Sequence, residues 1–225
     1  FGIVIPLLPF YGEHFGASPD EVTLLMAIYS LTQFITAPIW GRYSDRFGRR
    51  PILLISLAGT VAAYVWLALA EDLQTLFWAR ALAGVTAGSI SAAFAYMADV
   101  TTDENRSKGM GLLGAAFGLG FIAGPAIGGL LAGSDPATTN YQLPSYVAAG
   151  FSGAAFLAAL IILKESLSDD LKAKIANRTS GERWALFIHT MKLPTIRLTI
   201  ILTFVSIFAF AGLEATFAMW SEREF

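Results

Sequence analysis

Arg80 stands alone in an apolar segment, and a charge in that setting is a candidate for chemistry. No other residue between Asp72 and Asp99 is charged. Arg80 should lie about seven residues, or about 10 Å, into a helix that begins near Leu73. At that depth in hydrocarbon a charge costs about 2.5–3.5 kcal/mol on insertion scales, so we expect Arg80 to face a partner or a wet cavity. The alternative is that its side chain snorkels to the outer surface.

Small and polar residues at helical spacing extend this candidate site. Gly84 and Gly88 follow Arg80 at i+4 and i+8, which predicts a smooth face where another helix or a solute can approach. In the predicted span 21–40, Tyr29 and Gln33 are expected either to face a cavity or to hydrogen-bond another helix. Glu214, late in the last apolar segment, could carry protons, bind a cationic solute or snorkel outward.

A second cluster is the stretch from Gly41 to Pro51, where Asp45 stands among Arg42, Arg46, Arg49 and Arg50. We expect Gly41 to end one helix, Gly48 to permit a tight turn and Pro51 to lie in the first turn of the next helix. Asp45 can pair with Arg46 or Arg49, or accept from a helix N-terminus. The alternative is that these charges only set the orientation in the membrane.

The elements that must position these residues are membrane helices. The chain has 225 residues, of which 55% are hydrophobic and 14% charged, whereas soluble domains carry about 25% charge. The apolar runs are long enough to span a bilayer, except for a short first run that begins at Phe1 without a Met, so we expect earlier residues to be missing. We predict spans at 1–11, 21–40, 51–70, 73–98, 108–132, 144–164 and 195–220.

The distribution of Lys and Arg predicts the orientation. Of the 15 basic residues, 13 fall in the loops after the second, fourth and sixth predicted spans. Short cytoplasmic loops collect Lys and Arg, so these loops should face the cytoplasm. The opposite loops carry mainly acids: Glu13, Asp20, Glu71, Asp72 and Asp135.

The predicted span 108–132 is rich in glycine. Gly120, Gly124 and Gly128 recur every four residues and should line one face that permits close backbone contact. Pro125 removes a backbone hydrogen bond and should bend the helix, and Gly129 adds a further small residue. Ordinary small-residue packing is the simpler interpretation of the same pattern.

These motifs resemble those of the major facilitator superfamily. The Gly41–Arg50 stretch matches its loop signature, the Arg80 segment its helix-4 motif, Gly120–Gly129 its antiporter motif, and Gly2–Pro9 the helix-1 motif of drug:proton antiporters. The similarity is greatest to tetracycline-efflux-like proteins of the twelve-helix group. One departure is that Ala63, rather than an Asp, precedes Tyr64, so no drug can be named.

The resemblance implies roles for the candidate residues. The loop motif would latch the two halves of a transporter on the cytoplasmic side, with Asp99 joining its charge network. Arg80 would be linked to proton transfer, together with an acid that would fall before Phe1. The Gly120–Gly129 motif is typical of antiporters, which favours export of the solute.

The predicted fold is therefore an all-α polytopic bundle. We expect a six-helix N-terminal bundle in residues 1–165, a cytoplasmic linker in 166–194 that includes a surface helix at 184–191, and the start of a second bundle in 195–225. The predicted function is proton-coupled export of a small amphipathic solute by a multi-pass protein of the inner membrane. The expected partners are lipid, the solute and protons, without nucleic acid, metal or cofactor, and the expected state is a monomer.

Three alternatives remain open. The first is a metabolite or sugar uniporter or symporter of the same fold. The second is a seven-helix receptor or retinal protein, although the last span has no Lys for a Schiff base. The third is a membrane enzyme, which the absence of Cys and the separation of His14 from His189 disfavour.

Overall fold

The structure is a computed structural model in which the chain forms two compact units, residues 1–172 and 173–225. It describes residues 1–133, 139–167, 185 and 188–224, the last eleven of these by backbone alone. Six described helical segments are long and apolar enough to cross a membrane: Pro19–Phe47, Arg49–Ala68, Leu73–Val100, Arg106–Ala132, Gln142–Ile162 and Pro194–Leu213.

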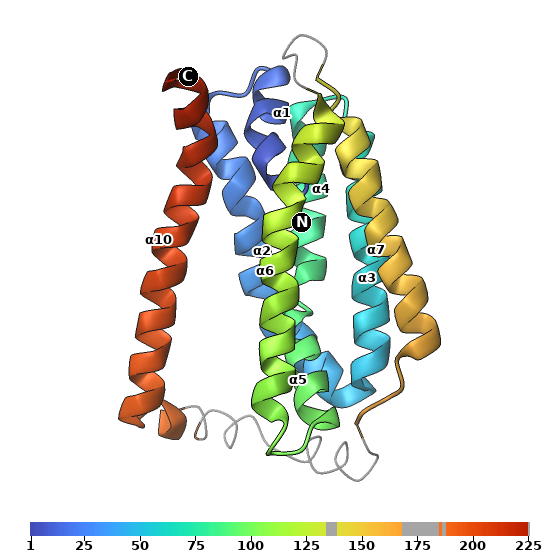
Figure 1. Cartoon of the computed structure of the whole chain (residues 1–225), viewed down its shortest axis with the longest axis vertical. Coiled ribbons are helices and arrows are strands. Elements are labelled where there is room, and N and C mark those ends of the chain that lie inside the picture. Colours follow the sequence, from blue (N-terminus) through green and yellow to red (C-terminus); the bar gives the residue numbers. More distant parts are fainter. Residues whose placement is uncertain (134–138, 168–184, 186–187, 225) are drawn as a thin grey trace. The chain divides into compact units, whose positions relative to one another are not determined.

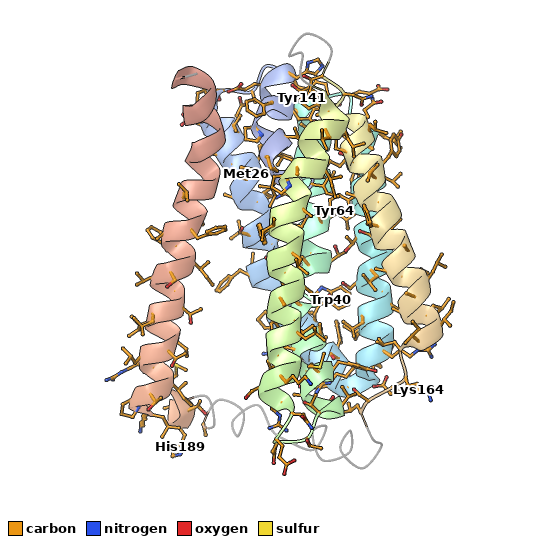
Figure 2. All side chains as sticks on the ribbon, viewed as in Figure 1. Met26, Trp40, Tyr64, Tyr141, Lys164 and His189 are labelled. Atoms are coloured by element: carbon orange, nitrogen blue, oxygen red, sulfur yellow. The ribbon has the colours of Figure 1, made fainter. Side chains whose placement is uncertain are left out.

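The first unit is an all-helical bundle (Figure 1). Its order is a 3-10 turn Ile5–Leu7, α1 Leu8–His14, α2 Pro19–Phe47, α3 Arg49–Ala68, α4 Leu73–Ala87, α5 Ile90–Val100, α6 Arg106–Ala132 and α7 Gln142–Ile162. Each predicted span is occupied by helix, with boundaries shifted by a few residues except at the end of α2. Figure 2 labels Tyr141 and Lys164 at opposite ends of this bundle.

Local signals explain where α2 and α4 begin. Ser18 and Glu21 form a capping box, in which the Glu21 carboxylate accepts from the Ser18 N–H at 2.8 Å. Asp72 caps α4, its carboxylate accepting from the Thr75 N–H at 2.6 Å. Both caps lie at the end of the bundle that the charge pattern predicts to face away from the cytoplasm.

The prediction that Gly41 ends the second span is wrong. Helix α2 continues through Gly41 to Phe47, so Asp45 and Arg46 lie in its last turns rather than in a loop. The chain turns at Gly48 instead, with φ of +110°, a conformation that side-chain-bearing residues rarely adopt. One interior glycine lowers helix propensity by only about 1 kcal/mol, which by itself is too little to end a helix.

The predicted fourth span is interrupted. Helix α4 ends at Ala87 and α5 begins at Ile90, with Gly88 and Ser89 between them. The end of α4 is marked by two short-range backbone bonds, from the Gly88 N–H to the Gly84 carbonyl oxygen and from the Ser89 N–H to that of Thr86. The run of apolar and small residues in this segment carried no sign of the break.

The closest helix pairs are α3 with α7, α2 with α4, and α3 with α4. Leu8, Leu25, Leu67 and Leu76 are fully buried between these helices. Large apolar side chains on the outside are exposed instead, such as Leu130 at 85% and Ile161 at 83%. Such a surface suits hydrocarbon rather than water.

The second unit contains α10, Pro194–Glu224, which covers the predicted span 195–220. The predicted surface helix at 184–191 is helical at residues 185 and 188–191, while residues 184, 186 and 187 lie outside the described residues, as does most of the predicted linker. The division of the chain at residues 165 and 194 stays a prediction.

Candidate functional site

Arg49 is the centre of a charge network at the predicted cytoplasmic end of the bundle. Its side chain is 8% exposed and donates from Nη1 to Asp45 at 2.6 Å and from Nε to Asp99 at 3.0 Å. Nη1 also donates to the Ser44 hydroxyl at 3.0 Å. One guanidinium thus joins the end of α2, the start of α3 and the end of α5, a use suited to its forked set of donors.

Of the two partners left open for Asp45, the structure selects Arg49. The guanidinium of Arg46 instead lies over the ring of Phe47, with 5.4 Å from Cζ to the ring centroid. Arg50 reaches the end of α7, where its Nη2 donates to the carbonyl oxygen of Leu160 at 2.9 Å. Asp99 also accepts from the Ser166 hydroxyl at 3.1 Å.

Glu165 completes this network, and the sequence did not single it out. Its carboxylate accepts from the backbone N–H of Arg49 at 2.8 Å and of Arg50 at 3.2 Å, so it caps the N-terminus of α3. It also accepts from the N–H groups of Ser166 and Leu167, both at 3.1 Å. A carboxylate at a helix N-terminus is favourable because free N–H groups and the helix dipole meet there.

A glycine is needed at position 48 for a second reason besides its positive φ, which is the space that the Glu165 carboxylate occupies. A Cβ built on Gly48 would lie 2.7 Å from Cδ of Glu165. The turn and the Glu165 cap therefore fit each other only because residue 48 has no side chain. An acid directly after the predicted span 144–164, at the same end as the basic Arg49 and Arg50, is the signal that could have pointed to Glu165.

Arg80 lies inside the bundle and does not snorkel, since only 2% of it is exposed. Its Cζ is 4.5 Å from the ring centroid of Tyr29 and 5.9 Å from that of Phe1. These rings are themselves 4.7 Å apart between centroids. Aromatic faces attract a cation and do so more strongly where water is excluded, so α2 and the first residues of the chain supply an aromatic lining for the charge.

Gly84 and Gly88 let α2 approach α4 closely, as their spacing predicted. A Cβ on Gly84 would lie 2.9 Å from the Tyr29 Cα, and one on Gly88 would lie 2.6 Å from the Thr36 hydroxyl. Gln33 donates to the carbonyl oxygen of Ala87 at 3.4 Å, so its side chain makes an interhelical hydrogen bond.

Side chains from α2 and α3 satisfy the carbonyl groups at the break between α4 and α5. The Val85 oxygen accepts from Trp40 Nε1 at 2.6 Å and from the Thr36 hydroxyl at 3.2 Å. The Thr86 oxygen accepts from the Ser56 hydroxyl at 2.8 Å, and that hydroxyl also contacts Ser89. Irregular backbone at membrane depth requires such partners because lipid offers none.

The glycines of α6 were predicted to line a face of close backbone contact, and only some of them do. A Cβ on Gly124 would lie 2.5 Å from the carbonyl carbon of Gly2, and one on Gly128 would lie 3.2 Å from that of Ile3. A Cβ on Gly120 or Gly129 would meet nothing within 4 Å among the described residues. The close approach to the first residues of the chain thus depends on Gly124 and Gly128, while α6 continues unbroken across Pro125.

The predicted site residues therefore form separate groups. Asp45, Arg49 and Asp99 come together at one end, Arg80 lies with Tyr29 in the interior, and Gly124 with Gly128 faces the chain start. The side chain of Glu214 falls outside the described residues. Hydrogen-bonding side chains that the sequence did not single out are Ser44, which accepts from Arg49, and the donors Trp40, Thr36 and Ser56.

Comparisons with known proteins agree with this architecture. Residues 1–224 match the family model described as Major Facilitator Superfamily. The chain is 40% identical over 188 residues to the class E tetracycline resistance protein of Escherichia coli, covering 80% of this chain and 45% of that protein. It is 31% identical over 225 residues to multidrug resistance protein 2 of Bacillus subtilis (strain 168), covering 100% of this chain and 55% of that protein.

A solved structure supports the fold alone. The crystal structure of the human organic anion transporter MFSD10 (TETRAN) superposes with a TM-score of 0.75 at 24% identity, over 99% of this chain and 61% of that one. The chain spans about half the length of the curated relatives it matches. On the family match and these relatives, the chain belongs to the major facilitator superfamily.

Proposed function

We propose that this bundle works in a secondary active exporter, which extrudes a small amphipathic solute in exchange for protons by alternating access. The tetracycline and multidrug resistance relatives support solute export. In this superfamily fold, two bundles rock about a central site. The observation that carries the proposal of proton coupling is the burial of Arg80 in the bundle interior.

Arg80 is suited to couple a proton to solute movement because its charge is permanent and its surroundings are fixed. A guanidinium stays protonated at physiological pH, so it can lower the cost of a nearby carboxylate and thereby control when that acid binds a proton. The Tyr29 ring at 4.5 Å holds the cation in place. The coupling acid itself would lie outside this chain or on a helix that comes close during transport.

The network around Arg49 supplies the second requirement, which is a reversible closure on the predicted cytoplasmic side. Ion pairs to Asp45 and Asp99 hold three helix ends together. Because the three helix ends belong to one bundle, the network fixes the surface that this bundle presents on that side. In this proposal the second bundle meets that surface when the cytoplasmic side is closed and leaves it when that side opens.

The test of coupling uses the full-length transporter in proteoliposomes with the Arg80→Lys and Arg80→Ala variants. We expect Arg80→Ala to abolish solute movement driven by a pH gradient, while solute exchange without a gradient continues at a measurable rate. Arg80→Lys should retain part of the driven transport because it keeps the charge. Arg42→Ala is the control, since Arg42 is exposed in the last turns of α2.

Three outcomes would contradict the proposal. Driven transport by Arg80→Ala at the wild-type rate would remove Arg80 from coupling. Accumulation of the solute with the proton gradient, rather than its extrusion against it, would instead select the symporter alternative. Loss of exchange as well as driven transport in Arg80→Lys would assign Arg80 a structural role.

A further inference from the structure

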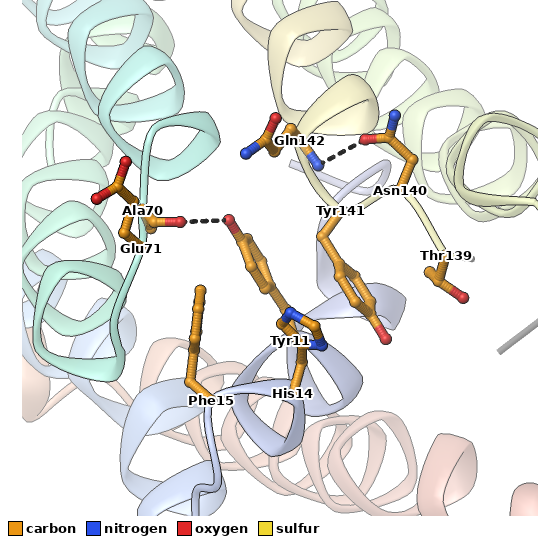
Figure 3. A pocket seen from close by; sticks show the side chains of 9 residues that line it. All are labelled: Tyr11, His14, Phe15, Ala70, Glu71, Thr139, Asn140, Tyr141 and Gln142. Carbon is orange, nitrogen blue, oxygen red and sulfur yellow. Dashed lines mark hydrogen bonds between the residues drawn. The ribbon is translucent and has the colours of Figure 1, made fainter. Parts of the chain in front are cut away.

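A cavity of about 510 Å³ opens at the end of the bundle opposite the Arg49 network. It lies between the end of α1, the turn from α3 to α4, and the start of α7 (Figure 3). Drug-sized ligands occupy pockets of about 300–1,000 Å³, so the volume suits a small organic molecule. The cavity is lined by Tyr11, His14, Phe15, Ala70, Glu71, Thr139, Asn140, Tyr141 and Gln142.

One wall of the cavity is a continuous set of aromatic rings. Tyr11 stacks on Tyr141 with 4.9 Å between centroids and 8° between planes. His14 lies 5.5 Å from Tyr141 and 5.3 Å from Phe15, centroid to centroid. The rings come from two segments far apart in the sequence, so the wall exists only in the folded bundle.

This wall is held in place before any ligand arrives. Tyr11 is 4% exposed, and its hydroxyl donates to the carbonyl oxygen of Ala70 at 3.1 Å. The side chain of Asn140 accepts from the N–H of Gln142 at 3.1 Å, which orders the start of α7 beside Tyr141 (Figure 3). A preformed site of this kind loses little entropy when a ligand binds.

The charge around the cavity favours a cation. Glu71 is the one acidic residue among those that line the cavity, and none of the lining residues is Lys or Arg. Glu13, Asp20 and Asp72 lie at the same end of the bundle. Acidic groups and aromatic faces both attract positive charge, whereas an anion would meet repulsion from every formal charge there.

We propose that this cavity is an external binding site for a planar aromatic monocation. The flat ring of such a ligand would pack on the exposed parts of His14, Phe15 and Tyr141, with the buried Tyr11 behind them, and its positive charge would lie toward the Glu71 carboxylate. The site is separate from Arg80 and from the Arg49 network, and it requires only the folded bundle. It therefore does not depend on proton coupling or on the direction of transport.

The test measures binding of N-methylquinolinium to the full-length protein in nanodiscs, by calorimetry, with neutral 1-methylnaphthalene as the matched ligand. We expect the cation to bind more tightly than the neutral compound. Glu71→Gln should weaken cation binding about fivefold or more, and Tyr141→Leu should weaken it by a similar factor through the loss of stacking. Glu13→Gln is the control, because Glu13 is an acid at the same end that does not line the cavity.

Glu71 is exposed, so Glu71→Gln should leave the fold intact, and a folded melting profile checks this. The same measurement in right-side-out and inside-out vesicles locates the site, since the permanently charged probe crosses membranes slowly. The proposal is overturned if Glu71→Gln and Glu13→Gln bind the cation equally well. It is also overturned if the naphthalene binds as tightly as the cation, or if binding occurs only in inside-out vesicles.

Discussion

Trp40 on α2 donates its indole N–H to the carbonyl oxygen of Val85 on α4 at 2.6 Å. The acceptor belongs to the last turn of α4, where carbonyl groups have no partner within their own helix. The bond therefore supports the backbone of one helix with the side chain of another.

Trp40→Phe should lower the stability of the full-length protein by about 1 kcal/mol, because it keeps the ring but removes the donor. The Thr36 hydroxyl lies 3.2 Å from the Val85 oxygen and 2.7 Å from the Thr32 carbonyl oxygen of its own helix, so it replaces the lost donor only in part. Thermal unfolding in detergent measures the effect. Trp78→Phe is the matched control, since Trp78 is exposed, and an equal shift in both variants would contradict the role given to Trp40.

Asp99→Asn should weaken the Arg49 network and lower the free energy of unfolding by about 1.5–3 kcal/mol. A hydrogen bond to a charged group usually contributes this much. The Asp99 side chain is 17% exposed, so solvent replaces it poorly as a partner of Arg49. The measurement is the melting temperature together with the transport rate in proteoliposomes. Asp103→Asn provides the comparison, because Asp103 forms an exposed pair with Arg106 and such pairs contribute little.

Glu165→Ala should destabilise the junction of α7 with α3 by about 1 kcal/mol, since the N–H groups of Arg49 and Arg50 lose their acceptor. Hydrogen exchange of the first turn of α3 is the direct measurement, and faster exchange there is expected. Glu104→Ala changes an exposed acid at the same end. Unchanged exchange in Glu165→Ala would show that water replaces the cap without loss.

Gly124→Ala should destabilise the bundle by about 1–3 kcal/mol, because the added methyl group overlaps the backbone at Gly2. Gly129→Ala should be close to neutral, since its Cβ meets open space. Comparison of their melting temperatures separates the two glycines of one motif. Equal melting temperatures would mean that the start of the chain moves aside at no cost.

The positions of the membrane helices could be predicted from the sequence because charge is excluded from them over long runs. The turn at Gly48 also follows from local spacing, whereas the choice of Arg49 over Arg46 as the partner of Asp45 came from the structure. The extension of α2 beyond Gly41 could not be predicted, since a single glycine is weak evidence for a helix end.

The break between α4 and α5 depends on groups distant in the sequence. Its carbonyl partners are Trp40, Thr36 and Gln33 on α2 and Ser56 on α3. In its local sequence, each of these residues looks like an ordinary polar or aromatic residue of a membrane helix. Glu165 was missed for a similar reason, because the N–H groups that it caps belong to a helix more than a hundred residues earlier.

The break also has a consequence for chimaeric transporters. A replacement of residues 73–100 by the matching segment of another family member would place new backbone against the old donors of α2 and α3. The carbonyl groups of Val85 and Ala87 keep their partners only when α2 supplies them, and that of Thr86 keeps its Ser56 bond only when α3 does, although the Ser89 N–H inside the exchanged segment remains with it. The smallest segment that can be exchanged between relatives, without taking hydrogen-bond partners away from these carbonyl groups, is thus the continuous stretch from α2 through α5.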